Sequence, residues 1–356
     1  MSRLGEAPSA RLPLLDEGTR VAATMTTRGS ENGLDDEQLV ALYRCAKTVR
    51  LTDERAAALA GTGAIGFQAP TGGHEAAVLG AAAALRERDW LFAGARDHAA
   101  ALWRGLPLRR YWDHLYANAD DVVKGRPMPD HFSYRQARVA SVTAPLGSQL
   151  SHAVGLAWAA RSQGADEVVL VMFGEGDVSS SDFHNALNFA GVWRAPVVFF
   201  CRTDAEEGGQ PSPPAPLVDS VADRGVAYGV EGVRCDGGDV LAVHAAVGAA
   251  IRRATAGEGA MLVEAAVPEG DPLATMRALV AERVGWSDAQ ETELDDELGE
   301  RVSTAVAAAE KAPRPPLSSM FEDIYAQPPW HLREQRDELG SSPRAPQRSF
   351  GPRGSR

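Results

Sequence analysis

The sequence predicts an α/β fold in which helices cover both faces of a parallel sheet. Residues 168–173 form a short, unbroken apolar run, as expected for a strand buried on both faces. A Gly-Glu-Gly turn centred on Glu175 follows, and a second apolar run begins at Val197. Apolar residues at helical spacing between the two runs complete a strand–helix–strand unit. Glu175 therefore lies at the carboxyl end of a strand, where open α/β sheets bind ligands.

Helix signals recur on both sides of this unit. Asp35 or Asp36 begins a helix whose apolar stripe runs to the glycine stop at residues 61–63. Ser179 and Asp182 form an S-x-x-D pattern, which predicts that the helix of the central unit begins there. The same reasoning predicts helices over residues 108–117 and 287–311 and a strand over 260–267. It also predicts a helix that follows residue 146 and ends at 160, and another that follows residue 240 and ends at 253.

Composition indicates one large domain with two unstructured ends. The chain has 356 residues, enough for a sizeable α/β core, and its 44% hydrophobic and 24% charged residues are ordinary for a globular protein. We predict a domain over residues 34–340, a flexible arm over 1–33 and a disordered tail over 341–356. The net charge of −12 argues against a surface for nucleic acid or anionic membranes.

Cysteine usage and hydropathy indicate the compartment. Cys45, Cys201 and Cys235 form no C-x-x-C pair, so neither a structural zinc site nor a disulfide framework is expected. No apolar run approaches the roughly 18 residues that span a bilayer. The first residues lack the apolar stretch of a signal peptide. We therefore expect a reduced, soluble, cytoplasmic protein.

Two acids suggest a metal site. Glu175 and Asp204 are 29 residues apart, and each ends one of two successive parallel strands, so their side chains can converge. Mg²⁺ prefers oxygen ligands and usually keeps coordination positions for a substrate phosphate. The helix that follows Glu175 offers free N–H groups to such a phosphate. An ordinary α/β turn, without any metal, is the alternative interpretation of the Gly-Glu-Gly pattern.

The segment over residues 174–202 resembles the diphosphate-binding segment of thiamine-diphosphate enzymes. It is similar above all to the alpha subunit of the branched-chain 2-oxo acid dehydrogenase, and the likeness extends from about residue 34 to residue 339. The resemblance implies a parallel-sheet thiamine-diphosphate-binding fold with thiamine diphosphate and Mg²⁺ as cofactors. It also implies oxidative decarboxylation of a branched-chain 2-oxo acid, with acyl transfer to a lipoyl group on a separate transacylase.

The resemblance also assigns site residues. Arg96 matches an arginine that holds the diphosphate in the family, with a surface ion pair to Asp97 as the alternative. Arg202 matches an arginine that assists the phosphates. Asp204 aligns with the metal-binding asparagine. The implied cofactor-binding residues are Arg96, Leu146, Glu175, Gly176 and Arg202, and the implied metal ligands are Glu175 and Asp204.

Several departures from the family suggest a degenerate active site. Ala95 and Ala144 stand where the family has a tyrosine and a serine. The family's histidine-bearing loop after the strand at 260–267 is missing, and no histidine lies between residues 244 and 331. His131, in a loop that lies near the active site in the family, is the one weak catalytic candidate. His74 replaces a family glutamine, and we interpret it as a helix cap or a satisfied core histidine.

The resemblance leaves alternative functions open. The first is an active alpha subunit that works in an α2β2 heterotetramer, in which the beta subunit supplies the activating glutamate. Residues 318–335 resemble the segment that packs on that beta subunit. The second is a non-catalytic paralogue that acts in assembly or regulation. The third is a pyruvate or acetoin dehydrogenase alpha subunit. Glu206, Glu207 and the proline-rich stretch at 210–216 replace an ordered segment of the family, and this loop is expected to be mobile.

Overall fold

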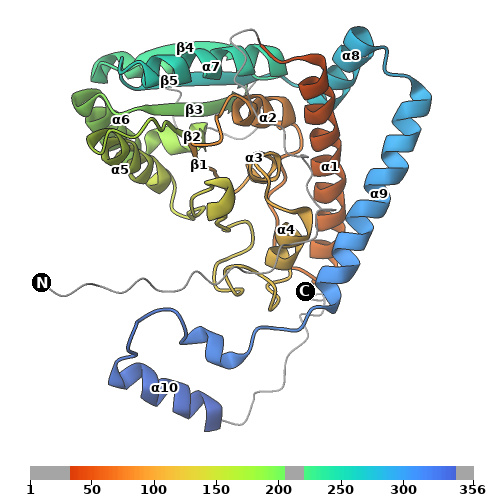
Figure 1. The fold of residues 1–356 in the computed structure, drawn as a ribbon, viewed down its shortest axis with the longest axis vertical. Coiled ribbons are helices and arrows are strands. Elements are labelled where there is room, and N and C mark those ends of the chain that lie inside the picture. Colours follow the sequence, from red (N-terminus) through yellow and green to blue (C-terminus); the bar gives the residue numbers. More distant parts are fainter. Residues whose placement is uncertain (1–32, 205–219, 342–356) are drawn as a thin grey trace, which may run out of the picture.

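Five strands form one parallel sheet in the computed structural model, which describes residues 33–204 and 220–341 (Figure 1). The order across the sheet is β1-β2-β3-β5-β4. The strands β1 to β5 span Trp90–Phe92, Val169–Gly174, Val197–Asp204, Glu231–Asp236 and Met261–Val267. The predicted parallel α/β sheet is confirmed.

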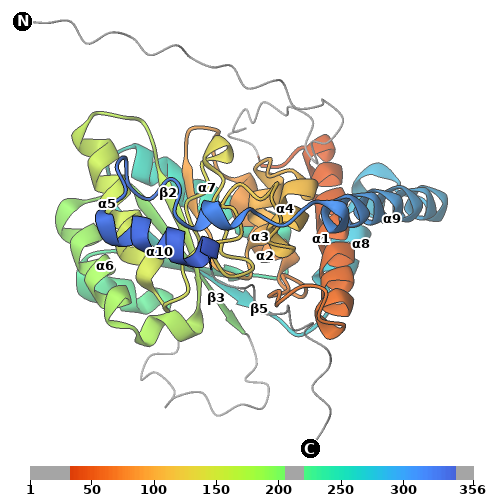
Figure 2. The same cartoon turned by 90° about the horizontal axis from the view of Figure 1, so that it is seen from below.

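Helices cover both faces of the sheet, and each face has its own apolar core. Val171 and Phe199 point to the face covered by α5 (Ser148–Ser162) and α6 (Ser181–Trp193). Phe200, one residue further along β3, points to the opposite face. The core of that opposite face includes α1 (Asp36–Gly61), α2 (Glu75–Ala83), α3 (His98–Trp103), α4 (Leu108–Leu115), α7 (Val240–Thr255), α8 (Pro272–Val284) and α9 (Asp288–Lys311). Figures 1 and 2 show the two helical layers from perpendicular directions.

Helix starts follow the sequence signals in most places. The Asp35 side chain accepts a hydrogen bond from the Gln38 N–H and forms a capping box with it. The prediction for Ser179 is wrong. A short 3-10 helix, η2 (Glu175–Ser179), follows β2, and Ser180 is the residue that caps α6, because its side chain accepts from the Phe183 N–H. The extra turn shifts the cap by one residue.

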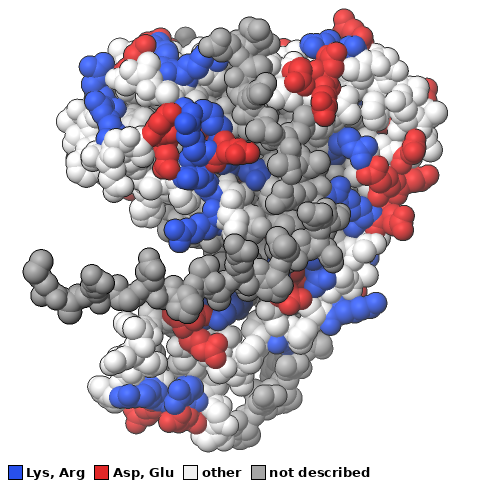
Figure 3. Space-filling model, in the orientation of Figure 1, with Lys and Arg blue, Asp and Glu red and all other residues white. Residues whose placement is uncertain are grey.

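Some predictions fall outside the described residues. These are the tail beyond residue 341, the stretch at 206–216 and, apart from Gly33, the N-terminal arm. Among the described residues, no helix combines the length and apolarity needed to cross a membrane. Figure 3 shows basic and acidic side chains interspersed over one face of the molecule.

The C-terminal segment extends from α9 along the lower edge of the molecule in Figure 1. It contains η4 (Leu317–Met320) and α10 (Trp330–Ser341), and no residue of α10 is buried. Two residues of the 124–126 loop hold its first part. Lys124 pairs with Asp323, and Arg126 donates to the backbone oxygens of residues 319 and 322.

Candidate functional site

A buried ion pair lies at the carboxyl edge of the sheet. Arg202, on β3, places Nη2 2.7 Å from Oδ1 of Asp97, and the two side chains are 8% and 0% exposed. Asp97 also accepts a hydrogen bond from the Gly94 N–H, which fixes its carboxylate in the turn after β1. The Arg202 Nε is buried and has no hydrogen-bond partner. Such an unsatisfied donor is costly unless a ligand uses it.

Arg96 lies beside this pair without joining it. The predicted alternative, an ion pair between Arg96 and Asp97, is wrong, because the Asp97 carboxylate is paired with Arg202. Arg96 is exposed, and its Nε donates to the Pro70 carbonyl over 3.2 Å. Its guanidinium makes no ion pair with any residue in the described part of the chain. Its remaining donors can therefore bind an anion.

His74 belongs to the same site, which the sequence interpretation did not anticipate. It occupies the N-cap position of α2, as one of the two interpretations held, but its side chain makes no capping bond. Its Nδ1 is buried without a hydrogen-bond partner, so it is not a satisfied histidine. Burial, followed by the positive charges of Arg202 and Arg96, lowers the pKa of His74 to about 4.

The turn after β2 carries the predicted acid and a second one. Glu175 and Gly176 are exposed, whereas Asp177 is buried. Asp177 accepts a hydrogen bond from the Gly174 N–H over 2.9 Å, and burial raises the pKa of its carboxyl group. Asp177 therefore shapes the turn. The sequence signal for it is an acid two residues after Glu175.

Glu175 and Asp204 end adjacent strands, as predicted. Gly174, the last residue of β2, pairs with Arg202 in the sheet register. Glu175 follows Gly174 directly, and Asp204, two residues after Arg202, is the last residue of β3. Both carboxylates are exposed. Within residues 33–204 and 220–341, no group of three or more His, Cys, Asp and Glu side chains is arranged to hold a metal ion. Any metal bound by these two acids would need further ligands from water or a substrate.

The loop that carries Leu146 packs against this turn. Leu146 is 67% exposed, and Gly147 follows it with φ +76°. A Cβ at Gly147 would lie 2.3 Å from the Ser180 Oγ, so only glycine fits this contact with the cap of α6. The Gly147 N–H also interacts with the Asp177 carboxylate. The Leu146 side chain is thus presented at the site without being buried in the domain.

His131 shows no contact with these groups. Its Nδ1 lies 2.8 Å from the Pro129 carbonyl in its own loop, and its N–H donates to the Met128 carbonyl. No contact described for His131 involves Arg96, Arg202 or Glu175. Its catalytic role stays a prediction.

A buried network supports the loop before His74. The Nε2 of His98 lies 3.0 Å from Oδ1 of Asp53, and both side chains are buried. Burial alone would lower the pKa of His98, but the carboxylates of Asp53, Asp130 and Asp97 together outweigh it and raise that pKa. The other oxygen of Asp53 accepts from the Gly72 N–H over 2.9 Å. Thr71 then joins the loop to the site, because its Oγ1 donates to the Arg96 carbonyl.

The connection after β5 is short. β5 ends at Val267 and α8 begins at Pro272, with the Asp271 side chain accepting from the Leu273 N–H at its start. This connection contains no histidine. The connection after β5 therefore brings no histidine to this edge of the sheet.

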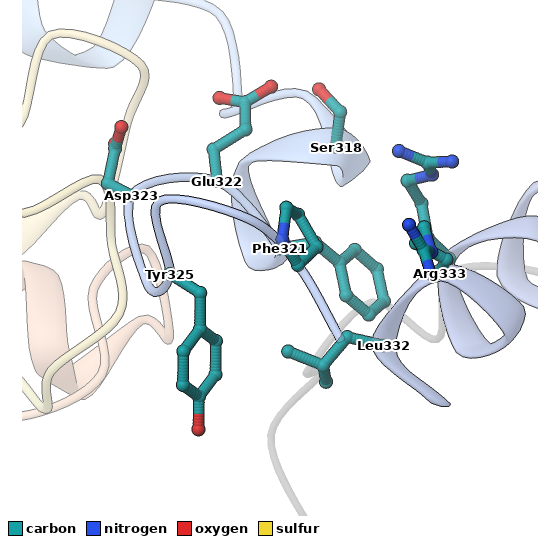
Figure 4. Close-up of a pocket in the computed structure, with 9 residues that line it drawn as sticks. Ser318, Phe321, Glu322, Asp323, Tyr325, Leu332 and Arg333 are labelled. Carbon is teal, nitrogen blue, oxygen red and sulfur yellow. The ribbon is translucent and has the colours of Figure 1, made fainter. Parts of the chain in front are cut away.

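A separate small pocket lies within the C-terminal segment (Figure 4). Phe321, Tyr325 and Leu332 provide its apolar side, and Arg333 lies at its rim (Figure 4). None of the residues that line it belongs to the site at the carboxyl edge of the sheet.

Comparison with known proteins gives consistent matches. The family described as dehydrogenase E1 component matches residues 43–267. The alpha subunit of mitochondrial 2-oxoisovalerate dehydrogenase from Caenorhabditis elegans is 31% identical, over 90% of this chain and 80% of that one. The alpha 2 subunit from Arabidopsis thaliana is 30% identical, over 96% of this chain and 78% of that one. The Dictyostelium discoideum alpha subunit is 32% identical, over 85% of this chain and 75% of that one.

Proposed function

The chain belongs to the dehydrogenase E1 component family, and from that membership we propose that it is the alpha subunit of a branched-chain 2-oxo acid dehydrogenase. Such a subunit takes part in the oxidative decarboxylation of a 2-oxo acid, with transfer of the acyl group to a lipoyl group. One observation carries the proposal. At the carboxyl edge of the sheet, Arg96 and Arg202 keep guanidinium donors that no other described residue uses. The relatives do not favour a pyruvate or acetoin dehydrogenase.

A diphosphate fits these two arginines. Guanidinium groups are planar and present paired donors that match phosphate oxygens. Arg202 is held in place by Asp97, so its free Nε does not have to be ordered when a ligand binds. When bound, thiamine diphosphate supplies the carbon nucleophile that decarboxylation of a 2-oxo acid requires. Arg96 and Arg202 would bind its diphosphate, and Leu146 would offer it an exposed apolar surface.

Magnesium fits the two exposed carboxylates. Glu175 and Asp204 would supply oxygen ligands from adjacent strand ends, and the remaining ligands would come from diphosphate and water oxygens. Two carboxylates and a diphosphate around one ion gather more negative charge than one divalent cation neutralises. The Arg96 guanidinium, which has no ion-pair partner among the described residues, would offset part of this excess.

A beta subunit fits the C-terminal segment. Met320, Ile324, Tyr325 and Trp330 are all more than half exposed, and several exposed apolar side chains in one segment are typical of protein contacts. We propose an α2β2 heterotetramer in which this segment packs on the beta subunit, and a lipoyl transacylase that receives the acyl group. A cytoplasmic location is proposed from the sequence alone, whereas the relatives are described as mitochondrial.

A non-catalytic alpha-subunit paralogue is the second candidate function. The four residues between β5 and α8 leave no place for the histidine-bearing loop of the family. Such a paralogue would assemble with the beta subunit and bind the cofactor without turning over substrate. Turnover of 2-oxoisovalerate by the chain purified with its beta subunit distinguishes an active enzyme subunit from a non-catalytic paralogue. Acyl transfer to a lipoyl domain supports the enzyme, and its absence in a complex that binds cofactor supports the paralogue.

A further inference from the structure

His74 is attached to the same loop that positions Arg96. The His74 N–H donates to the Thr71 carbonyl over 2.9 Å, and the Thr71 Oγ1 donates to the Arg96 carbonyl over 2.7 Å. The Arg96 Nε in turn donates to the Pro70 carbonyl. These three bonds link the backbone that carries His74 to the backbone that carries Arg96, so the two side chains keep a fixed relation.

The imidazole of His74 is oriented but unused. Its Nδ1 is buried and has no hydrogen-bond partner, and the side chain does not cap α2 although it occupies the capping position. Histidine at this position is a poor cap, since Ser, Thr, Asp and Asn are the residues that cap helices well. A half-buried polar ring with no partner loses free energy unless it meets a ligand.

The charges around His74 are those of the proposed diphosphate site. The groups that act on it are the Arg202 and Arg96 guanidiniums and the Asp204 and Asp97 carboxylates. Asp97 is already neutralised by Arg202. His74 therefore lies within electrostatic reach of both arginines and of one of the two proposed metal ligands.

We propose that His74 is a third diphosphate-binding residue, which donates an imidazole N–H to a phosphate oxygen beside Arg96 and Arg202. This inference rests on the proposed function, because it requires a diphosphate at this edge of the sheet. A neutral imidazole carries one N–H and adds a directional donor without a third positive charge. The low pKa of His74 is consistent with a neutral ring in the free protein at pH 7.

Calorimetric titration of the chain, purified with its beta subunit, tests this role. Inorganic diphosphate and thiamine diphosphate are titrated separately, each with Mg²⁺, into the wild type and into His74→Ala, His74→Leu and His74→Gln. The loss of a hydrogen bond to a charged group predicts that the Ala and Leu variants bind both ligands about tenfold to 100-fold more weakly. His74→Gln keeps an N–H donor and is expected to restore most of the affinity. His152→Gln, at an exposed position on α5, is the matched control and is expected to bind like the wild type.

Comparison of the Leu and Gln variants decides the result even if His74→Ala is poorly folded. Both side chains fill the space of the imidazole, but only glutamine donates a hydrogen bond. Equal affinity of these two variants for inorganic diphosphate, or wild-type affinity in His74→Leu, would overturn the role of His74 while leaving the proposed function intact. Failure of the wild type to bind either ligand would overturn the proposed function and this inference together.

Discussion

Asp97 and Arg202 join two strand ends of the sheet through a buried contact of 2.7 Å. Asp97 follows β1 and Arg202 lies near the end of β3, so the pair spans β2 and the turn that carries Glu175. It fixes a guanidinium whose Nε has no other partner. The ion pair therefore prepares one side of an anion site before any ligand arrives, and this arrangement is the basis for assigning a diphosphate to it.

Asp97→Asn tests this arrangement directly. The substitution keeps the shape of the side chain but leaves the buried Arg202 charge without compensation, which predicts a loss of about 3–5 kcal/mol in the free energy of unfolding. Bound diphosphate would compensate the same charge. Urea unfolding with and without thiamine diphosphate and Mg²⁺ is the measurement, and a larger stabilisation by ligand in the variant than in the wild type is expected. Equal stabilisation of the two proteins would place Arg202 outside the site.

The Asp53–His98 pair predicts a pH dependence of stability. The folded-state pKa of His98 is raised, so the stability that the pair contributes is fully present below about pH 6.5 and is lost as pH rises through that raised value. Asp53→Asn removes the partner charge. Urea unfolding between pH 6 and pH 10 is expected to show the largest difference between wild type and variant at the acid end. A difference that does not change with pH would contradict the charged pair.

The three thiols are expected to react slowly with electrophiles. Burial raises the pKa of Cys45 to about 12 and that of Cys235 to about 11, and it also raises that of Cys201. A shift from 9.0 to about 11 lowers the thiolate fraction of Cys235 at pH 8 by about 100-fold, and its rate of reaction falls with it. Reaction with a chromogenic disulfide at pH 8 is the measurement. Cys235, which is only half-buried, should react first, and fast reaction of all three would contradict the burial.

Removal of the chain after Tyr325 tests the C-terminal segment. No residue of α10 is buried, so the truncated domain is expected to unfold at the same temperature as the full chain but to lose co-purification with the beta subunit. The truncation retains the contacts of Lys124 and Arg126 with the segment's first part. Deletion of residues 342–356 alone is the control and should leave assembly unchanged. Normal assembly of the longer truncation would show that α10 is not the contact.

Much of the fold could be predicted from local patterns. The apolar runs of β2 and β5 are continuous, so their predicted bounds differ from the observed ones by a single residue. Two of the five strands were not predicted. The apolar run of β1 is only three residues long, and β4 is an edge strand whose partly exposed residues form no continuous apolar run. The start of α6 was misplaced because η2 adds a turn that the S-x-x-D pattern does not reveal.

The site was less predictable than the fold. Glu175 and Asp204 could be placed because each lies at the end of a strand that begins as an apolar run: Glu175 follows β2 directly, and Asp204 is the last residue of β3. The pairing of Asp97 with Arg202 depends on which strands are neighbours in the sheet, which local spacing does not specify. The role of His74 depends on the absence of a partner for its ring, and such an absence is visible only once every neighbour is placed.

Glu175 is proposed to bind Mg²⁺ and, with it, thiamine diphosphate. Calorimetric titration of thiamine diphosphate into the chain purified with its beta subunit, with and without Mg²⁺, tests this most directly. We expect tight binding that depends on Mg²⁺, its loss in Glu175→Ala, and no change in the control Glu269→Ala, whose exposed carboxylate lies in the turn after β5. Unchanged affinity in Glu175→Ala, or no binding by a complex that assembles normally, would contradict it.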